Sequence, residues 1–175
     1  MAVRIESMSE DDIVAVASID GPTRMSEDQL LQELTRPWAR LWLARETLAR
    51  ETLAGETVAG DERGVAAYVV AWQVADELHV LNVATRPDRR RRGLARALVD
   101  HAVDYARSQR DRQVLLEVRR SNLSAIALYR AVGFFAMGVR ARYYPDDEDA
   151  IEMVLALDPD TGAIVPHADE VRLNG

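Results

Sequence analysis

The chain has 175 residues, of which 48% are hydrophobic and 29% charged, and its formal net charge is -7 at pH 7. This composition is typical of a soluble globular domain and excludes a fibrous or intrinsically disordered chain. The chain has no cysteine and only three scattered histidines. A disulfide framework and a thiolate metal site are therefore excluded, and we expect no metal.

The N-terminal residues MAVRIESMSEDD lack the basic stretch and apolar run of a signal peptide. No apolar run approaches the ~20 residues that cross a bilayer, so we expect a cytoplasmic protein without a membrane partner. The acidic total also argues against general nucleic-acid binding, which relies on a broad positive surface.

The first part of the chain predicts a strand, two helices and a second strand. Residues 3–5 alternate apolar and polar side chains, as a strand does. Segments 9–20 and 26–36 each open with a serine followed by acids, which favours a helix N-terminus, and Gly21-Pro22 separates them. Residues 39–46 alternate again and predict the next strand.

A five-residue unit then repeats almost verbatim in LARETLARETLAGETVAGDE, from Leu43 to Glu62. A five-residue period matches neither a helix face nor a strand face. We therefore interpret residues 47–63 as an expanded loop between two hairpin strands. The alternative is a short helical insertion, because Leu, Ala, Arg and Glu all favour helix.

The remainder of the chain predicts strands and helices in alternation, followed by two final strands. In chain order these are a strand at 64–74, a strand at 78–87, a long amphipathic helix from Gly93, a strand at 113–119, a helix at 121–133, and strands at 134–144 and 149–157. Periodicity is lost after Asp158, so we expect 158–175 to be a loose tail. The order predicts one α/β (α+β mixed) domain over 1–157, with a mixed sheet of about seven strands and helices on both faces.

Four consecutive arginines, Arg89 to Arg92, lead through Gly93 into the long helix. A helix N-terminus offers unpaired N–H groups and a partial positive charge, and glycine lets a phosphate approach the backbone. The arginines can pair with further phosphate oxygens. A solvated helix start is the alternative, but cations are mildly unfavourable at this end of a helix, which favours a bound anion as their purpose.

Three separated motifs resemble the GNAT superfamily of N-acetyltransferases: RRRGLA (90–95), LEVRRSNLSAIALYRAVGF (116–134) and RARYYPDDEDAIEMVL (140–155). Together they are similar to the branch of ribosomal-protein N-terminal alanine acetyltransferases, the RimI type, over about 78–157. The resemblance implies a GNAT fold, in which two parallel strands splay apart at the cofactor site, and acetyl-CoA as the co-substrate.

The same resemblance implies the residues that hold acetyl-CoA. Backbone groups of the strand end would pair with the pantetheine arm, the glycine loop would hold the pyrophosphate, and one polar side chain of the following helix would add a contact. These residues are, in that order, Val83, Ala84 and Thr85; Arg90, Arg91, Arg92, Gly93, Leu94 and Ala95; and Asn122. Helix capping is the alternative for Asn122, and both roles are compatible.

Two residues are candidates for proton transfer. Glu117 lies on an otherwise apolar strand, where an idle carboxylate is costly to bury and where partial burial favours a general base. By resemblance it is the proton acceptor, acting through a water; a strand glutamate paired with Arg119 or Arg142 is the alternative. By resemblance Tyr129 is the general acid that protonates the leaving thiolate, and a core tyrosine is the alternative.

Tyr143 and Tyr144 precede four acids at 146–149. In the resembling branch the paired tyrosines hold the substrate's N-terminal residues, and the acids can attract a cationic peptide. A solvated hairpin turn with aromatic cross-strand packing is the alternative. The branch's Pro-Trp-Ser stretch is replaced here by residues around Arg24-Met25, so the loop beside the acceptor is altered.

The sequence therefore predicts an enzyme that moves the acetyl group of acetyl-CoA to a protein N-terminal α-amine, of the ribosomal-protein alanine type, by direct attack in a ternary complex. An acetyltransferase for a small-molecule amine and a non-catalytic acetyl-CoA-binding module are the alternatives. A nucleic-acid partner comes last, because one arginine cluster must overcome the net charge of -7.

Overall fold

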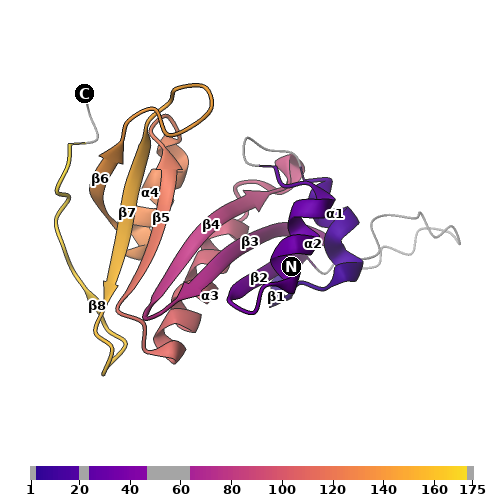
Figure 1. Ribbon diagram of the computed structural model, residues 1–175, viewed down its shortest axis with the longest axis horizontal. Coiled ribbons are helices and arrows are strands. Elements are labelled where there is room, and N and C mark those ends of the chain that lie inside the picture. The colour runs from indigo at the N-terminus through magenta and orange to yellow at the C-terminus, as the bar shows by residue number, and fades with distance from the viewer. Residues whose placement is uncertain (1–2, 20–23, 47–63, 173–175) are drawn as a thin grey trace, which may run out of the picture. The chain divides into compact units, whose positions relative to one another are not determined.

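The computed structural model describes residues 3–19, 24–46 and 64–172. Within these ranges the strands form one sheet in the order β1-β2-β3-β4-β5-β7-β6, and β8 pairs with β7 (Figure 1). The strands are β1 (Val3–Ser7), β2 (Ala39–Glu46), β3 (Val65–Val74), β4 (Glu77–Thr85), β5 (Gln113–Arg119), β6 (Phe135–Arg140), β7 (Ala150–Leu157) and β8 (Ile164–Val165). The helices are α1 (Ile13–Ala17), α2 (Glu27–Thr35), α3 (Leu94–Gln109) and α4 (Leu123–Val132), with 3-10 turns at Glu10–Asp12 and Pro87–Arg89.

The predicted mixed α/β class and the predicted order of elements are confirmed. Two elements are shorter than predicted. At 9–20 a 3-10 turn over Glu10–Asp12 precedes a helix of only Ile13–Ala17, and at 134–144 the strand ends at Arg140 instead of continuing to Tyr144. Arg142 has a φ of 50°, which an extended strand does not allow, and the chain turns there. Gly21-Pro22 and the repeat at 47–63 lie outside the described residues, so the loop and helical interpretations of the repeat stay predictions.

The chain forms two compact units, Met1–Val70 with Asn82–Leu98 and Ala71–Leu81 with Val99–Gly175. Strands β3 and β4 and helix α3 each contribute residues to both units. A single domain over 1–157 therefore stays a prediction. No helix in the described ranges is long and apolar enough to span a membrane.

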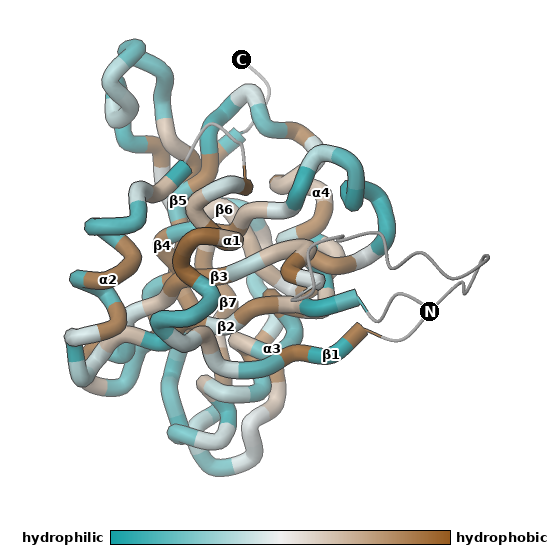
Figure 2. Tube along the Cα trace, turned by 90° about the vertical axis from the view of Figure 1, so that its right-hand side faces the viewer, coloured by the Kyte–Doolittle hydropathy of each residue, from teal (hydrophilic) through white to brown (hydrophobic). Residues whose placement is uncertain are grey.

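In the first unit, β1 and β2 pair antiparallel, with Val3 opposite Glu46 and Ser7 opposite Trp42. Helix α2 begins after Ser26, whose hydroxyl oxygen accepts a hydrogen bond from the Gln29 amide at 3.2 Å, as the sequence predicts for a serine cap. Helix α2 contacts both α1 and β2. Figure 2 shows α1 as an almost wholly hydrophobic turn of chain, which explains why it packs against its neighbours.

In the second unit, β7 is flanked by two antiparallel partners, β5 and β6 (Figure 1). Helix α4 is capped by Asn122 and ends at Gly133, whose φ of 122° suits glycine alone. A parallel ladder joins β4 to β5, with Glu77–Val80 opposite Gln113–Leu116. Both strands continue beyond this ladder, β4 to Thr85 and β5 to Arg119, so a parallel pair lies where the GNAT resemblance requires one.

Residues 159–172 make ordered contacts within the second unit, which differs from the loose tail predicted for 158–175. Strand β8 pairs with β7, and the Ala136 amide and carbonyl bond to the Asp169 carboxylate and the Glu170 amide, each at 2.8 Å. The His167 ring stacks on Phe135 with centroids 4.8 Å apart. These hydrogen bonds and this ring contact are isolated and have no regular spacing along the chain, so no periodic pattern in the sequence predicts them.

Candidate active site

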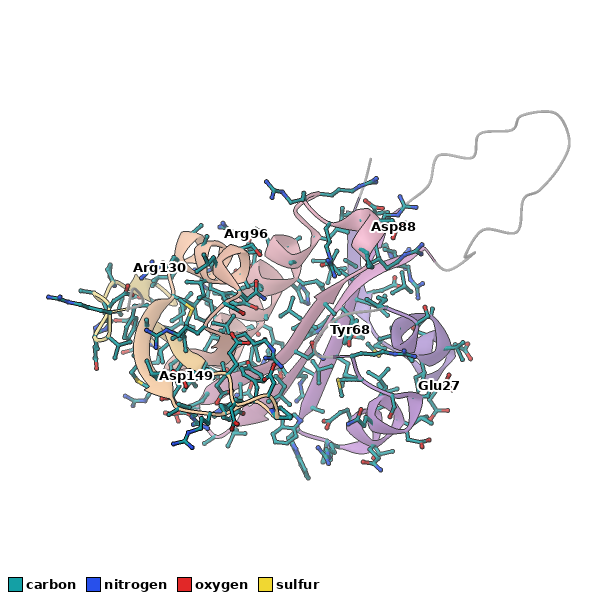
Figure 3. The ribbon with its side chains drawn as sticks, turned by 90° about the horizontal axis from the view of Figure 1, so that it is seen from above. Glu27, Tyr68, Asp88, Arg96, Arg130 and Asp149 are labelled. Carbon is teal, nitrogen blue, oxygen red and sulfur yellow. The ribbon has the colours of Figure 1, made fainter. Side chains whose placement is uncertain are left out.

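In the first unit, the loop between β4 and α3 presents a helix N-terminus. Arg86 donates its amide to the Ala66 carbonyl at 2.9 Å, and a 3-10 turn follows, on which Asp88 lies (Figure 3). Arg91 and Gly93 then have φ angles of 62° and 81°, which turn the chain into α3. A Cβ added at Gly93 would meet no heavy atom within 4 Å. The backbone conformation therefore favours glycine here, and the approach to the helix end stays open.

The four arginines of this loop divide into two pairs with different surroundings. Arg89 and Arg92 hold the carboxylate of Glu46, the last residue of β2, at 3.1 and 3.5 Å, and this side chain is only 2% exposed. Arg90 and Arg91 are exposed, and neither side chain forms an ion pair or hydrogen bond with any other residue that the structure describes. Two arginines thus compensate a buried charge, and two are available for an anion.

The predicted pantetheine strand, Val83 to Thr85, is the half-buried end of β4. Asn82, just before it, donates its side-chain amide to the hydroxyl of Tyr68 on β3 at 3.3 Å (Figure 3 labels Tyr68). Burial raises the pKa of Tyr68, and its hydroxyl also bonds to the backbone of Met25. The altered loop around Met25 is thereby attached to the strand end, through two polar residues that we did not predict.

In the second unit, Glu117 lies directly opposite Glu152, so both carboxylates project from the same face of the sheet. Arg140 bridges them: its Nε donates to Glu152 Oε1 at 2.6 Å, and its Nη1 lies 3.4 Å from Glu117 Oε1. The Glu117 side chain is 27% exposed, which fits the partial burial expected of it. Its cationic partner is Arg140, not the Arg119 or Arg142 that the alternative interpretation named.

Tyr129 is a buried residue of α4, and its ring packs on Phe134 with centroids 5.8 Å apart. Burial, and secondarily the neighbouring Tyr144, raises the pKa of Tyr129 to about 12. The phenol is therefore fully protonated near neutral pH, as a general acid must be before it donates. The surroundings fit a core tyrosine equally well, so its catalytic role stays a prediction.

Tyr143 and Tyr144 lie just after β6, and their rings meet edge-on at 5.2 Å and 88°. The guanidinium carbon of Arg119 lies 4.0 Å from the centre of the Tyr144 ring, and that of Arg140 lies 5.6 Å from the centre of the Tyr143 ring. Burial chiefly raises the pKa of Tyr144, and the negative charge of Glu117 adds to this effect. The structure thus gathers Glu117, Tyr143 and Tyr144 in one place, with Tyr129 in electrostatic contact with Tyr144.

Most of the acids that follow Tyr143 and Tyr144 form ion pairs or hydrogen bonds within the protein. Arg119 pairs with Asp146 at 2.9 Å and with Glu148 at 2.7 Å. Asp149 (Figure 3) accepts the backbone amide of Arg142 at 3.0 Å. Hydrogen bonds from Ser121, and then from Arg119, lower the pKa of Glu148 to about 2. With the Arg120–Asp149 pair at 3.4 Å, two arginine charges face the four carboxylates of 146–149, so about half of the negative charge that was expected to attract a cationic peptide is offset.

Asn122 caps α4, since its side-chain oxygen accepts the Ala125 amide at 3.2 Å. This is the capping role that the sequence suggested, and a contact with acetyl-CoA stays a prediction. Among the residues of 3–19, 24–46 and 64–172, no three acidic or histidine side chains gather as a metal site.

Besides Asn82 and Tyr68, three charged residues of these clusters were missed: Arg140, Glu152 and Glu46. Glu152 is a lone acid in the apolar segment AIEMVLAL, and that signal was available. Glu46 closes an alternating strand beside the repeat, and Arg140 is one of several arginines near the paired tyrosines. For these two, only the folded arrangement distinguishes them from surface charges.

The acetyltransferase (GNAT) family model matches residues 21–134. The [ribosomal protein bS18]-alanine N-acetyltransferase of Escherichia coli is 42% identical over 96 residues, which cover 53% of this chain and 65% of that protein. A putative enzyme of the same name from Bacillus subtilis is 37% identical over 90 residues, which cover 51% of this chain and 60% of that protein. This chain thus spans less than two thirds of the length of both relatives.

The crystal structure of the ribosomal-protein-S18-alanine N-acetyltransferase from Escherichia coli has a TM-score of 0.73 and 27% sequence identity to this chain, with 98% of this chain and 99% of that chain covered. The parallel β4–β5 pair and the glycine loop before α3 have the positions that this fold requires. With a family model that covers most of the chain, these features establish that it belongs to the acetyltransferase (GNAT) family.

Proposed function

We propose that this protein is an acetyl-CoA-dependent N-acetyltransferase that acts in the cytoplasm on the N-terminal α-amine of a protein. The proposed acceptor is an N-terminal alanine of the ribosomal-protein type. The observation that carries the proposal is the cluster of Glu117, Tyr129, Tyr143 and Tyr144 within the second unit. A carboxylate, a protonated phenol and two aromatic rings are the groups that acetylation of a peptide amine needs. The relatives named for alanine N-acetylation support the choice of acceptor.

The loop before α3 fits the diphosphate of acetyl-CoA. Gly93 leaves the helix end open, and Arg90 and Arg91 are exposed cations without a carboxylate partner among the described residues. Arg92, Leu94 and Ala95 complete the loop, and the backbone of Val83, Ala84 and Thr85 would bind the pantetheine amides, with Asn122 as a further contact. Acetyl-CoA supplies the acetyl group as an activated thioester.

The chemistry of the side chains can be followed proton by proton. A peptide α-amine has a pKa of ~7.7–8.0, so near neutral pH it must lose a proton before it attacks. Glu117, partly exposed and ionisable, would accept that proton through a water. As the new C–N bond forms and the C–S bond breaks, Tyr129 would donate its phenolic proton to the thiolate sulfur. The second proton that the nitrogen loses as the amide forms would pass through water and restore the phenol. Direct attack leaves no covalent enzyme intermediate.

Tyr143 and Tyr144 would hold the first residues of the acceptor. Tyr143 is 47% exposed, and its ring is free to contact a peptide, whereas Tyr144 is fixed beneath Arg119. A fixed aromatic ring beside an accessible one provides contact area for a peptide at a small cost in side-chain entropy.

The test is release of CoA from acetyl-CoA in the presence of four acceptor classes. These are short peptides with a free N-terminal Ala, Ser or Met, the same peptides with a blocked N-terminus and an internal lysine, free polyamines, and aminoglycosides. We expect turnover with free N-termini, highest for Ala. Turnover confined to lysine or to small amines would contradict the proposal, as would tight acetyl-CoA binding with no turnover of any acceptor.

A further inference from the structure

The guanidinium of Arg140 occupies a position that a substrate ammonium would favour. It hydrogen-bonds Glu152 at 2.6 Å, approaches Glu117 to 3.4 Å and lies 5.6 Å from the centre of the Tyr143 ring. Carboxylates and aromatic faces attract any cation, whether a guanidinium or a peptide α-ammonium. The Arg140 side chain is 50% exposed, so it is able to move.

The strand alignment explains why these groups meet. Glu117 is opposite Glu152 across β5 and β7, and Gly138 is opposite Glu152 across β6 and β7. Arg140 lies two residues after Gly138 on β6 and therefore projects from the same face. The three strands lie side by side (Figure 1), so Glu152 is between the base and the arginine.

Gly138 makes room for the Glu152 carboxylate. A Cβ added at this position would lie 2.5 Å from Glu152 Oε2, closer than any real Cβ contact. Position 138 thus accepts no side chain while Glu152 keeps this orientation. The chain places a bulge in β6 between Ala136 and Gly138, which aims Arg140 at the two carboxylates.

We propose that Glu152 is a positioning residue: it holds Arg140 back from Glu117, so that the acceptor's ammonium can displace the guanidinium and reach the base. This inference rests on the proposed function, in which Glu117 accepts the proton. The shorter contact is the one to Glu152, and the contact to Glu117 is longer than a charge-assisted hydrogen bond. Glu152 thus competes with the base for the same guanidinium.

The charges lead to the same conclusion. Two carboxylates and one guanidinium sum to one negative charge, which attracts a cationic acceptor. Without Glu152 the sum is zero, and Arg140 keeps Glu117 as its carboxylate neighbour in the cluster. The arginine would then close onto the base and exclude the amine. The guanidinium is charged at every working pH, as arginine is in proteins, and the hydrogen bond to Glu152 is the main cause that raises the pKa of Arg140 further.

The test is a double-mutant cycle with Glu152→Gln, Arg140→Gln and the combination, assayed with an acceptor that the wild-type protein acetylates. We expect Glu152→Gln to raise KM for the acceptor and lower kcat, with a combined loss of about tenfold or more, the size of coupling that charged neighbours show. Arg140→Gln alone should change kcat/KM by less than about threefold. The double variant should recover to the level of Arg140→Gln, because the competing cation is gone.

Two controls separate positioning from structure. KM for acetyl-CoA and the melting temperature should stay at wild-type values in all three variants, and Glu170→Gln, which removes an exposed carboxylate with no contact to Arg140, should leave the acceptor KM unchanged. The proposal is overturned if Glu152→Gln has wild-type kinetics, or if the double variant is no better than Glu152→Gln. Wild-type turnover of peptides tests the proposed function separately, before any variant is compared.

Discussion

Glu117 is the residue on which the proposed chemistry depends most directly. Glu117→Gln keeps the shape of the side chain and removes the proton acceptor. We expect kcat near neutral pH to fall by about 10²- to 10⁴-fold, the usual contribution of a general base. The affinity for acetyl-CoA, measured by calorimetry, should not change, because the proposed phosphate contacts belong to other residues. Unchanged turnover would remove Glu117 from the mechanism.

Tyr129 makes a prediction about pH. A general acid works only while it is protonated, and the pKa of this buried phenol is raised from 10.0 to about 12. The phenol therefore loses its proton at a pH about two units higher than an exposed tyrosine does, so kcat should stay constant from roughly pH 8 to 10. A fall in kcat centred near pH 10 would contradict this. Tyr129→Phe should lower kcat at all of these pH values.

The sequence proposes site residues that belong to a recognisable motif, and it misses residues that are brought to the same cluster by strand register. Glu117 and Tyr129 belong to motifs that can be read along the chain. Arg140 and Glu152 come together because Glu152 lies opposite both Glu117 and Gly138, and Arg140 follows Gly138 by two residues on β6. That alignment depends on a bulge in β6. A lone charge in an apolar strand is the sequence signal that deserves more weight.

At the scale of elements, the loop before α3 combines two kinds of arginine, and they should respond differently to mutation. Arg89→Gln leaves the buried Glu46 carboxylate with less compensation, so we expect a loss of about 3 kcal/mol in the free energy of unfolding. Arg90→Gln and Arg91→Gln should leave that free energy unchanged within about 0.5 kcal/mol, and should weaken acetyl-CoA binding by about tenfold each.

Urea denaturation and calorimetric titration of the same variants measure both quantities. The two groups of variants act as controls for each other, because each removes one positive charge from the same loop. The assignment of separate roles to these arginines is wrong if Arg89→Gln weakens acetyl-CoA binding without loss of stability. It is also wrong if Arg90→Gln and Arg91→Gln lower the free energy of unfolding.

The ends of helices and strands were predictable where the sequence has a capping residue or a clear alternating pattern. Strand β2 has the predicted bounds, and α2 and α4 begin after the predicted Ser26 and Asn122 caps. The segment after Asp158 was not predictable, because β8 has two residues and the remaining contacts are single hydrogen bonds. Such contacts depend on the surface they meet, which a local pattern does not contain.

For the whole molecule, a net charge of -7 coexists with an arginine-rich loop because the charges are paired locally. Glu46 pairs with Arg89 and Arg92, and Arg119 pairs with Asp146 and Glu148. Under the proposed function, Arg90 and Arg91 would hold the diphosphate of acetyl-CoA, which would account for an arginine cluster in an acidic protein. Family membership and the mixed sheet could both be anticipated from three motifs in the right order.

The central claim is that a protein N-terminus is the acceptor, and one peptide tests it most directly. A peptide that begins with a free alanine and carries one internal lysine offers both kinds of amine at equal concentration. After incubation with acetyl-CoA and the wild-type protein, tandem mass spectrometry locates the acetyl group. We predict acetylation of the α-amine of alanine and an unmodified lysine. An acetyl group on the lysine, or none on the peptide, would contradict the claim.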